Sequence, residues 1–571
     1  MSKHVSKYLH KEMDKQAGIE HTIKRTKIVA TVGPACDTYD KLLSLVKAGV
    51  NVFRLNFSHG SHEDKARIID LIRQINQNEP YNIAILADLQ GPKLRVGEIE
   101  NNALEIVPGD ILTFTNTKCI GTKEQIYVSY PNLHADVRLA GRIRMNDPAA
   151  RANRPPLALH VPEPSYRPGD TPDFSSVSVP AAGSAPRPDV AAPASETHPL
   201  TTHLVRVLDD DGRAVGPWDP RLGPDTLRQM LKDMKTVRVF DDRMYRAQRQ
   251  GKTSFYMKCT GEEAIAVAAA HALDRDDMNF PTYRQQGLLI ARGYPLETMM
   301  CQIYSNRADP LHGRQLPIMY SDREHGFFSI SGNLGTQYPQ AVGWAMASAI
   351  KGDSRIAMGW IGEGATAEGD FHSALTFASV YQAPVVLAVV NNQWAISSFS
   401  GLAGAEQATF AARAVGYGIA GLRVDGNDAL AVHAAVRWAA DRARSNHGPT
   451  LIEFFTYRAE GHSTSDDPTG YRPAGEAGAW PLGDPIARLK QHLVQLGEWD
   501  DDRDTALDKD IDATVRAAQK RAETDGVLPQ QGFERIGSMF EDVFAETPWH
   551  LAEQRDEALA EAREFLGHEP K

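Results

Sequence analysis

The chain of 571 residues is poor in cysteine and in long apolar runs, and its 62 Lys and Arg residues are outnumbered by 73 Asp and Glu residues. No pair among the four cysteines has Cys-x-x-Cys spacing, so we expect reduced structural thiols, as in a cytosolic protein. The location that we expect is cytoplasmic, of the bacterial type. The formal net charge of -11 argues against nucleic acid as a bulk electrostatic partner. No stretch approaches ~18 uncharged apolar residues, and the N-terminus lacks an apolar signal core, so we expect no membrane segment.

Lysine is scarce too, but only in the later part of the chain. Residues 1–137 hold 12 Lys and 5 Arg, whereas the remaining residues hold 9 Lys and 36 Arg. Both residue types serve a solvated surface about equally well, so folding does not require this switch. We therefore predict a chimera that is joined between about Asp136 and Met145.

The first part of the chain alternates between short β-branched runs and segments with helical periodicity. We expect strands over 27–32, 50–57 and 83–89 and helices over 39–48 and 63–77. This βαβαβ series is typical of a parallel barrel, whose chemistry lies at the carboxyl ends of its strands.

Three stretches here, TKIVATVGPA, AGVNVFRLNFSHGSHED and ILADLQGPKLRVG, resemble the start of the pyruvate kinase family. The positions that match that family's potassium, phosphate and nucleotide sites are Arg54, Asn56, Ser58, His59, Asp88 and Arg95. The resemblance stops at about residue 137, before the family's catalytic lysine and its metal-binding Glu/Asp pair. It covers roughly three of eight barrel units, so we interpret these residues as remnants and do not expect pyruvate kinase activity.

Farther along, two buried strands are predicted over 354–362 and 383–391, with a helix over 367–381 between them. The first strand ends in the turn Gly362-Glu363-Gly364-Ala365, and Asn392 follows the second strand, 29 residues after Glu363. Free amides at such a turn suit a diphosphate, and a carboxylate beside phosphate requires a cation. Oxygen atoms of Glu363, Asn392 and the Trp394 carbonyl would form a magnesium site. The alternative is a glycine turn with an unrelated Asn pair.

This arrangement resembles the signature of thiamine-diphosphate-binding folds. A wider resemblance to the alpha subunits of the branched-chain (2-oxoisovalerate) dehydrogenase family runs from about Leu157 to near the C-terminus. It is carried by SFYMKCTGEEA, FPTYRQQG, GRQLPIMYS, ISGNLGTQYPQAVGWAMASAIKGD, NNQWAIS and TYRAEGHSTSDDPTGYRP. The fold expected is α/β, a thiamine-diphosphate-binding fold with a parallel sheet and helices on both faces, preceded by an incomplete (β/α)8-barrel fragment.

The family's site residues carry over position by position. The implied cofactor contacts are Tyr283, Arg284, Leu334, Gly362, Glu363, Gly364, Ala365, Asn392, Arg458 and His462. The implied magnesium ligands are Glu363, Asn392 and Trp394, and a structural cation, usually potassium, is implied at Ser331, Asn333, Thr336 and Gln337. His462 is implied to assist proton transfer, for which a group that titrates near neutrality is suited.

Several of these residues have simpler interpretations. Arg284 could form a surface ion pair, His462 could be a core histidine, Leu334 could be an ordinary core leucine, and the potassium loop could be capped without an ion. Val390 stands where some members have an arginine, which removes one expected phosphate contact. Ser463 matches a serine that is phosphorylated in some eukaryotic members, with a plain loop hydroxyl as the alternative.

The resemblance implies thiamine-diphosphate-dependent oxidative decarboxylation of 3-methyl-2-oxobutanoate and related 2-oxoacids. The acyl group then passes to a lipoyl-bearing acyltransferase partner. In this family the glutamate that activates the cofactor comes from a beta subunit, so we expect activity only in an alpha2beta2 heterotetramer. The alternatives are an acetoin- or pyruvate-type alpha subunit, and an inactive fusion.

We expect five segments along the chain. They are a partial barrel (1–100), the start of a small β domain (101–137), a Pro/Ala-rich arm and linker (138–200), the cofactor-binding domain (201–480) and a C-terminal helical region (481–571). In the last region, helices are expected over 484–495, 509–524, 531–550 and 553–567.

Overall fold

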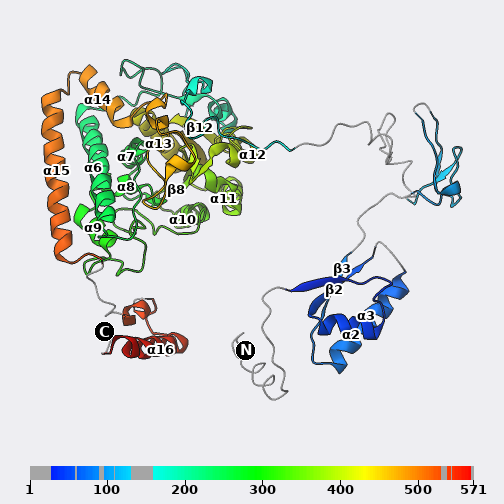
Figure 1. Cartoon of the computed structure of the whole chain (residues 1–571). Helices are drawn as coiled ribbons and strands as arrows, with labels where there is room; N and C mark the ends of the chain where they lie inside the picture. Colours follow the sequence, from blue (N-terminus) through cyan, green and yellow to red (C-terminus); the bar gives the residue numbers. More distant parts are fainter. Residues whose placement is uncertain are drawn as a thin grey trace. The chain divides into compact units, whose positions relative to one another are not determined.

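The computed structural model describes residues 27–57, 61–88, 96–107, 110–129, 159–528, 536–541 and 543–567. The chain divides into two compact units, Met1–Leu157 and Ala158–Lys571 (Figure 1). Ser58, His59 and Arg95 lie outside the described residues, and so does the predicted junction.

The first unit contains a three-stranded parallel sheet of order β1-β2-β3 with two helices. Its elements are β1 (Ile28–Thr31), α2 (Tyr39–Lys47), β2 (Val50–Asn56), α3 (His62–Asn78) and β3 (Ala84–Asp88). Their order and type are those predicted. Farther on, the short strands β4 (Phe114–Thr115) and β5 (Ile126–Tyr127) pair with each other, after the turn η1 (Glu100–Asn102).

Only one face of this sheet carries a helical layer. Phe53 and Leu55 of β2 are fully buried in a cluster that also contains Leu42 of α2 and Ile72 of α3. Arg54, between them in sequence, lies on the opposite face and is half-exposed. In a closed barrel that face would be interior, so the described fragment leaves it uncovered.

The second unit is built on six parallel strands in the order β6-β12-β13-β9-β8-β7. They are β6 (Leu204–Val205), β7 (Met278–Phe280), β8 (Ala357–Gly362), β9 (Val385–Asn391), β12 (Ala420–Asp425) and β13 (Thr450–Phe455). Every residue of β9 and β13 is buried, as expected for a parallel sheet covered on both faces.

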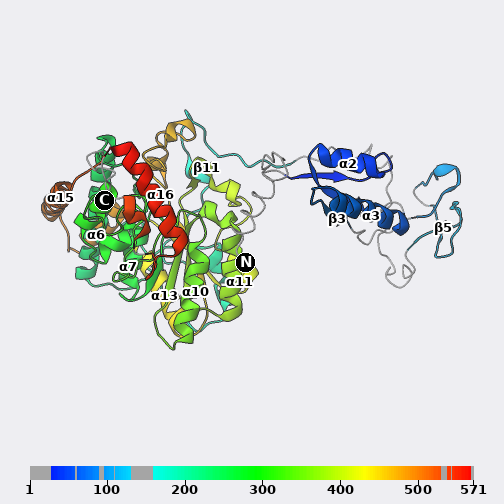
Figure 2. The same ribbon diagram turned by 90° about the horizontal axis from the view of Figure 1, so that it is seen from below.

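Alternate side chains of these strands enter two different cores. Trp360 and Ala388 belong to the core that contains α7 and α13, whereas Ile361 and Val389 belong to the core that contains α10 and α11. Figure 2 labels these four helices. These helices are α7 (Glu263–Ala272), α10 (Gln337–Ile350), α11 (Gly369–Tyr381) and α13 (Ala429–Arg444), and the short α12 (Arg413–Tyr417) joins the second core. The predicted parallel sheet with helices on both faces is confirmed.

Further helices extend the layer outside α7. α6 (Pro224–Arg249), α8 (Gln286–Ala291) and α14 (Pro485–Gln495) pack on α7, and α15 (Asp501–Thr524) packs on α6 and α9 (Leu296–Tyr304). α15 begins eight residues before the predicted start because the Asp500 carboxylate caps it, accepting a hydrogen bond from the Arg503 amide at 2.8 Å. No helix among the described residues is long and apolar enough to cross a membrane.

The predicted helix over 531–550 is wrong for the described residues of that range. A 3-10 turn, η8 (Ile536–Phe540), is followed by irregular backbone, and α16 (Trp549–Leu566) starts only after Pro548. Proline disfavours helical backbone in the residue before it, so a helix here begins at or after Pro548.

The arm over 159–203 has little regular structure, as predicted, but it is tied to the domain. It contains only the 3-10 turns η2 (Phe174–Ser176) and η3 (Ala194–Thr201). The Trp438 indole donates to the Pro188 carbonyl at 2.9 Å, and Arg442 donates to the carbonyl oxygens of Val190 and Ala192. The arm therefore packs on α13.

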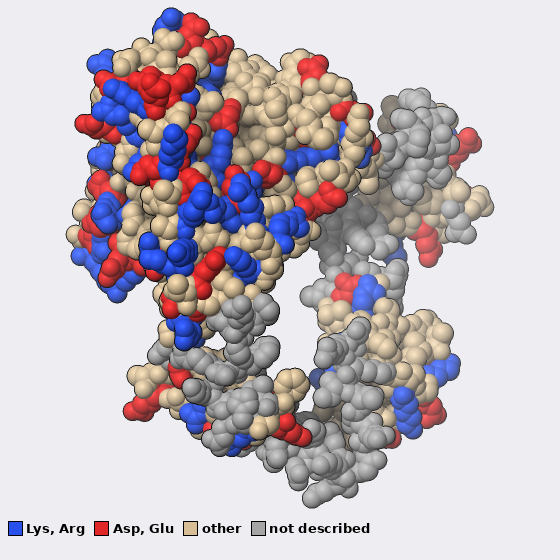
Figure 3. Space-filling view, turned by 60° about the vertical axis from the view of Figure 1, so that its left-hand side comes forward, with Lys and Arg blue, Asp and Glu red and all other residues tan. Residues whose placement is uncertain are grey.

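Charged side chains are interspersed on the face of the larger unit that Figure 3 shows. Both signs of charge occur over this face, and blue Lys and Arg residues are more frequent toward its lower middle part.

Candidate functional site

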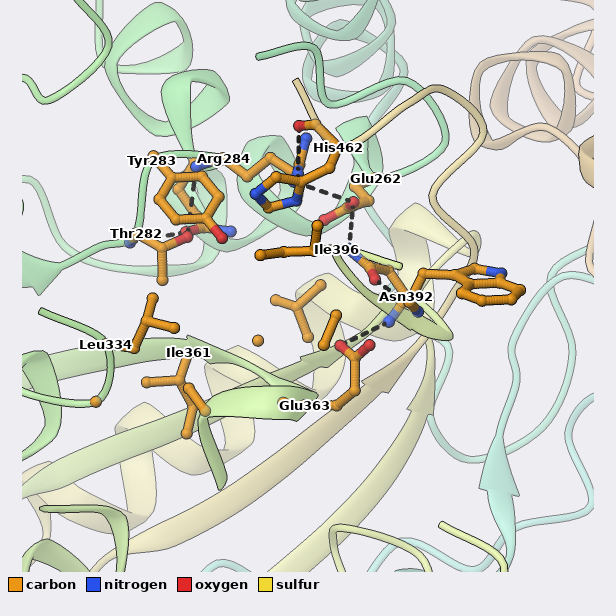
Figure 4. Close-up of a pocket in the computed structure, with 18 of the residues that line it drawn as sticks. Glu262, Thr282, Tyr283, Arg284, Leu334, Ile361, Glu363, Asn392, Ile396 and His462 are labelled. Atoms are coloured by element: carbon orange, nitrogen blue, oxygen red, sulfur yellow. Dashed lines mark hydrogen bonds and ion pairs between the residues drawn. The ribbon is translucent and has the colours of Figure 1, made fainter. Parts of the chain in front are cut away.

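A pocket lies where the loops that follow β7, β8, β9 and β13 meet (Figure 4). The carboxyl edge of an open parallel sheet is where α/β folds bind their ligands. The predicted residues that line it are Tyr283, Arg284, Leu334, Gln337, Gly362, Glu363, Gly364, Ala365, Asn392, Trp394 and His462. The sheet thus brings together side chains that are far apart in the sequence.

The turn after β8 is a 3-10 segment, η4 (Glu363–Ala367), that precedes α11. At Gly364, a side-chain Cβ would lie only 2.5 Å from the Cβ atom of Ala395. Ala395 belongs to the hairpin β10 (Trp394–Ala395) and β11 (Ser398–Phe399), which continues into the turn η5 (Ser400–Ala403). Glycine is therefore required for the close approach of this hairpin to η4.

Glu363 is a buried carboxylate with one unsatisfied oxygen. Glu363 is 1% exposed, and its Oε2 atom accepts a hydrogen bond from the backbone N–H group of Asn392 at 3.4 Å. Its Oε1 atom is buried without a hydrogen-bond partner. Burial, with a smaller contribution from Glu262, raises the pKa of Glu363 to about 7. A buried unpaired carboxylate oxygen is what a cation would satisfy.

Asn392 and Trp394 lie directly beside Glu363. The Asn392 Nδ2 atom donates to Glu262 Oε1 at 2.8 Å, and its Oδ1 atom accepts from the Trp394 amide at 3.3 Å. The Trp394 carbonyl accepts a hydrogen bond from Arg458 at 3.0 Å and retains a second lone pair. The three predicted magnesium ligands are thus neighbours at one corner of the pocket.

Arg284 and His462 form the opposite side of the pocket. Arg284 is 5% exposed, and its Nη2 atom donates to the Nδ1 and carbonyl oxygen of His462 at 3.0 and 2.9 Å. Because a guanidinium can only donate, His462 Nδ1 carries no proton, and the ring proton lies on Nε2. Burial, reinforced by Arg284 and Arg458, lowers the pKa of His462 to about 3, so the imidazole is neutral.

Arg458 lies behind the pocket and does not line it. It is fully buried, and burial lowers its pKa to about 10. Its guanidinium donates to the carbonyls of Trp394 and Ile396 at 3.0 and 2.8 Å. Ile396 has a φ of 56°, a left-handed conformation that is strained for a β-branched residue. Arg458 therefore fixes the loop that carries Trp394.

The predicted potassium loop is closed by its own hydrogen bonds. The Ser331 hydroxyl accepts from the Asn333 amide at 3.1 Å, and the Thr336 hydroxyl donates to the Asn333 carbonyl at 2.9 Å. Gln337 is buried, and its Oε1 atom has no hydrogen-bond partner. That oxygen gives the loop one acceptor that a cation could use.

The structure decides two of the simpler interpretations. Arg284 is buried and bonded within the pocket, so it is not a surface ion pair. Leu334 is 46% exposed at the pocket wall, so it is not an ordinary core leucine.

In the first unit, Arg54 of β2 and Asp88 of β3 form an ion pair. Their side chains are 35% and 41% exposed.

The sequence-based prediction missed Glu262, Thr282 and Ile396, which also line the pocket. Glu262 is 4% exposed, and burial raises its pKa. The signal that could have found it is the pair Glu262-Glu263 at the start of an alanine-rich segment. An alanine-rich helix is expected to be buried, and carboxylates that are buried with it need specific partners.

Three stretches of the chain match known families. Residues 231–531 match the family described as dehydrogenase E1 component, and residues 155–195 match the 2-oxoisovalerate dehydrogenase E1 alpha subunit N terminal. Residues 23–151 match the pyruvate kinase barrel domain, which carries that match beyond the predicted end at about residue 137.

Similar proteins cover the second unit. The alpha subunit of 2-oxoisovalerate dehydrogenase from Pseudomonas aeruginosa is 62% identical over 402 residues, which are 70% of this chain and 98% of that protein. The mitochondrial alpha subunit from Mus musculus is 39% identical over 64% of this chain and 82% of its own length. A mitochondrial alpha subunit from Arabidopsis thaliana is 40% identical over 61% of this chain and 73% of its own length.

The bacterial relative is matched almost completely by 402 residues of this chain, so the remaining residues have no counterpart in it. This supports the predicted chimera. The E1 component match alone spans more than half of the chain. The chain therefore belongs to the family of 2-oxoisovalerate dehydrogenase alpha subunits, carried behind a fragment of a pyruvate kinase barrel.

Proposed function

We propose that the chain is the alpha subunit of the decarboxylating component of branched-chain 2-oxoacid dehydrogenase, with 3-methyl-2-oxobutanoate and related acids as substrates. The acyl group would pass to a lipoyl-bearing acyltransferase. The family implies dependence on thiamine diphosphate. The observation that carries the proposal is the unpaired, buried Glu363 oxygen beside Asn392, in one pocket with Arg284 and His462.

The residues present fit magnesium and a diphosphate. Among the described residues, no three His, Cys, Asp or Glu side chains gather around one point, so a metal would need phosphate oxygens as further ligands. Glu363, Asn392 and the Trp394 carbonyl would supply the protein's oxygen atoms, which magnesium prefers. Arg284 supplies a guanidinium for the phosphate charge. Ser331, Asn333, Thr336 and Gln337 would hold potassium.

When bound, thiamine diphosphate supplies the electron sink that decarboxylation of a 2-oxoacid requires. His462 contributes a neutral imidazole whose Nε2 atom carries the proton, as the bond from Arg284 to Nδ1 dictates. Its Nε2–H group can donate a hydrogen bond to a substrate oxygen and so stabilise negative charge that develops there, while the imidazole stays neutral. The edge-on ring of Tyr283, 5.8 Å from the imidazole centre, limits where His462 can move.

A beta subunit would complete the site. The carboxylates that line the pocket are Glu262 and Glu363. Glu262 is bonded to Asn392, and the unpaired oxygen of Glu363 lies at the proposed metal corner, so the described residues of this chain offer no further carboxylate in the pocket to activate a cofactor's aminopyrimidine. The pocket volume of about 200 Å³ is also below the ~300–1,000 Å³ typical of small-molecule sites. Both observations support an alpha2beta2 assembly with the pocket at a subunit interface.

The test is co-expression with a branched-chain beta subunit, for the full chain and for a version that starts at Met145. Decarboxylation of 3-methyl-2-oxobutanoate is followed with thiamine diphosphate and magnesium. We expect activity in both versions, and faster turnover than with pyruvate or acetoin. Activity only in the truncated version would show that the N-terminal fragment blocks assembly. Inactivity of both, with a proven alpha subunit active under the same conditions, would refute the proposal.

A further inference from the structure

Glu262 lies between the two halves of the pocket, just before α7 (Figure 4). It is 4% exposed and lines the pocket. Its Oε1 atom is 2.8 Å from the Asn392 Nδ2 atom and 3.8 Å from the Arg284 Nε atom. One buried carboxylate oxygen therefore contacts both the metal side and the phosphate side of the pocket.

The hydrogen bond between Glu262 and Asn392 determines the orientation of the Asn392 side-chain amide. A carboxylate can only accept, so the amide nitrogen must face Glu262 and the amide oxygen must point away from it. The oxygen then accepts from the Trp394 amide, on the side where Glu363 contacts the Asn392 backbone. A flipped amide would place its oxygen against a carboxylate, which is repulsive in a buried site.

The contact with Arg284 places a negative charge under that guanidinium. The Nη2 atom of Arg284 is bonded to His462, and its Nη1 atom is bonded to the Lys258 carbonyl at 2.6 Å. Glu262 faces the remaining Nε side at 3.8 Å. These three contacts hold the Arg284 guanidinium on three sides.

We propose that Glu262 is a positioning residue that holds the Asn392 amide oxygen in the orientation for metal binding and holds Arg284 beside His462. This inference rests on the proposed cofactor site, and it deepens that proposal by naming a residue that acts through Asn392 and Arg284. Residues that orient a metal ligand affect metal affinity about 10- to 100-fold when they are replaced.

Glu263 offers a matched control. It is the next residue, it is 1% exposed, and it is equally enclosed. Its partners are the Arg238 Nε atom at 2.7 Å and the Gly261 amide at 2.9 Å, and it does not line the pocket. Replacing it removes a buried carboxylate from the same turn without touching Asn392.

The experiment measures Mn²⁺ binding by electron paramagnetic resonance, with thiamine diphosphate present, in the complex of the full chain with a branched-chain beta subunit. We expect Glu262→Gln to weaken Mn²⁺ binding about 10- to 100-fold. A Gln–Asn pair can be bonded with either amide orientation, so the amide is no longer fixed. Glu262→Asp keeps the one-sided acceptor and should recover part of the affinity. Glu263→Gln should stay within about twofold of the unmodified protein, and thermal unfolding confirms that each variant is folded.

Unchanged Mn²⁺ affinity in Glu262→Gln, or an equal loss in Glu263→Gln, would overturn the inference. A fall in kcat at saturating cofactor, with Mn²⁺ affinity unchanged, would also overturn it and would assign Glu262 to the chemistry. The expected kinetic result is a raised apparent KM for thiamine diphosphate, with kcat within about threefold. If the unmodified complex itself bound no Mn²⁺ with thiamine diphosphate, the proposed cofactor site would fail, which is a distinct result from the loss of one orienting contact.

Discussion

The two units of this chain use the same kind of sheet and differ in what covers it. In the second unit, strand β9 lies between two helical cores and all seven of its residues are buried. In the first unit, β2 buries Phe53 and Leu55 against α2 and α3, but Arg54 and Asn56 on its other face are only half-buried. Parallel sheets are stable mainly when both faces are covered.

The comparison shows that helices on both faces of a sheet affect how strongly its polar residues interact. Arg54 and Asp88 form an ion pair at 35% and 41% exposure, where solvent screens the charges and such pairs contribute ~0–1 kcal/mol. Arg284 is 5% exposed, and every contact that it makes acts in a low-dielectric pocket. Similar residue types are therefore solvent-screened in the first unit and enclosed in a buried pocket in the second.

The largest expected effect is a difference in decarboxylation rate between a substitution in the second unit and one in the first. Glu363→Ala removes the buried carboxylate at the predicted metal corner, so decarboxylation by the complete complex should fall at least ~100-fold. Arg54→Ala removes the best-placed remnant and should leave the rate unchanged. Steady-state rates with 3-methyl-2-oxobutanoate measure both. Glu363→Ala activity within twofold of the unmodified rate would contradict the site.

Core truncation tests whether the units are stable independently. Phe53→Ala and Phe454→Ala each remove a fully buried aromatic ring, which costs about 3–5 kcal/mol. Calorimetry should show two unfolding transitions, with Phe53→Ala lowering one and Phe454→Ala the other. Decarboxylation should survive Phe53→Ala. A single transition that both substitutions shift would mean that the units unfold together.

The pH dependence of stability should distinguish the buried site of the larger unit. Burial raises the Glu363 pKa from 4.5 to about 7, so the folded, metal-free protein favours the neutral acid. The contribution of Glu363 to the free energy of unfolding is fully present below pH 4.5. It is lost as the pH rises through 7, and the full change is about 3 kcal/mol.

Urea unfolding of the metal-free protein from pH 4.5 to 7.5 measures that change, with Glu363→Gln as the control that cannot titrate. The low pKa of His462 acts in the opposite direction below pH 6.5, so the difference between the two proteins is the quantity of interest. With magnesium and thiamine diphosphate the trend should reverse, because a metal ligand must be ionised. An identical pH profile for the two proteins would disprove the assignment.

The smallest expected effect is one that the two units should share. Ser61 caps α3 through the Asp64 amide at 3.1 Å, and Asp500 caps α15 through the Arg503 amide at 2.8 Å. Ser61→Ala and Asp500→Ala should each lower the free energy of unfolding of their own unit by ~1 kcal/mol. Chemical denaturation of each variant measures this. Unequal losses would show that sheet coverage affects even the helix ends.

The sequence predicted those parts of the fold that depend on local patterns. The apolar runs of β8 and β9, the glycine turn after β8 and the helices of the first unit all have short-range signatures, and the structure contains each of them. The helix predicted over 531–550 failed because composition outweighed one residue, Pro548, in the prediction.

The missing part of the candidate site depends on contacts between distant segments. Glu262 and Asn392 are 130 residues apart, and their bond exists only once α7 packs beside the sheet edge. The position of Arg458, behind the loop, follows from the path of the backbone at Ile396 and has no signature in the residue pattern. Resemblance supplied the names of many pocket residues, but it did not supply the bonds between them.

Ile396 carries a consequence for how the pocket is filled. Its left-handed backbone lies in a loop that Arg458 holds through two carbonyl oxygens, so residues of the chain itself shape the loop that bears the Trp394 carbonyl. A ligand that enters then loses its own freedom but does not have to order this loop as well. The conformational entropy of the loop is lost when the chain folds, so ligand binding does not have to oppose that loss again.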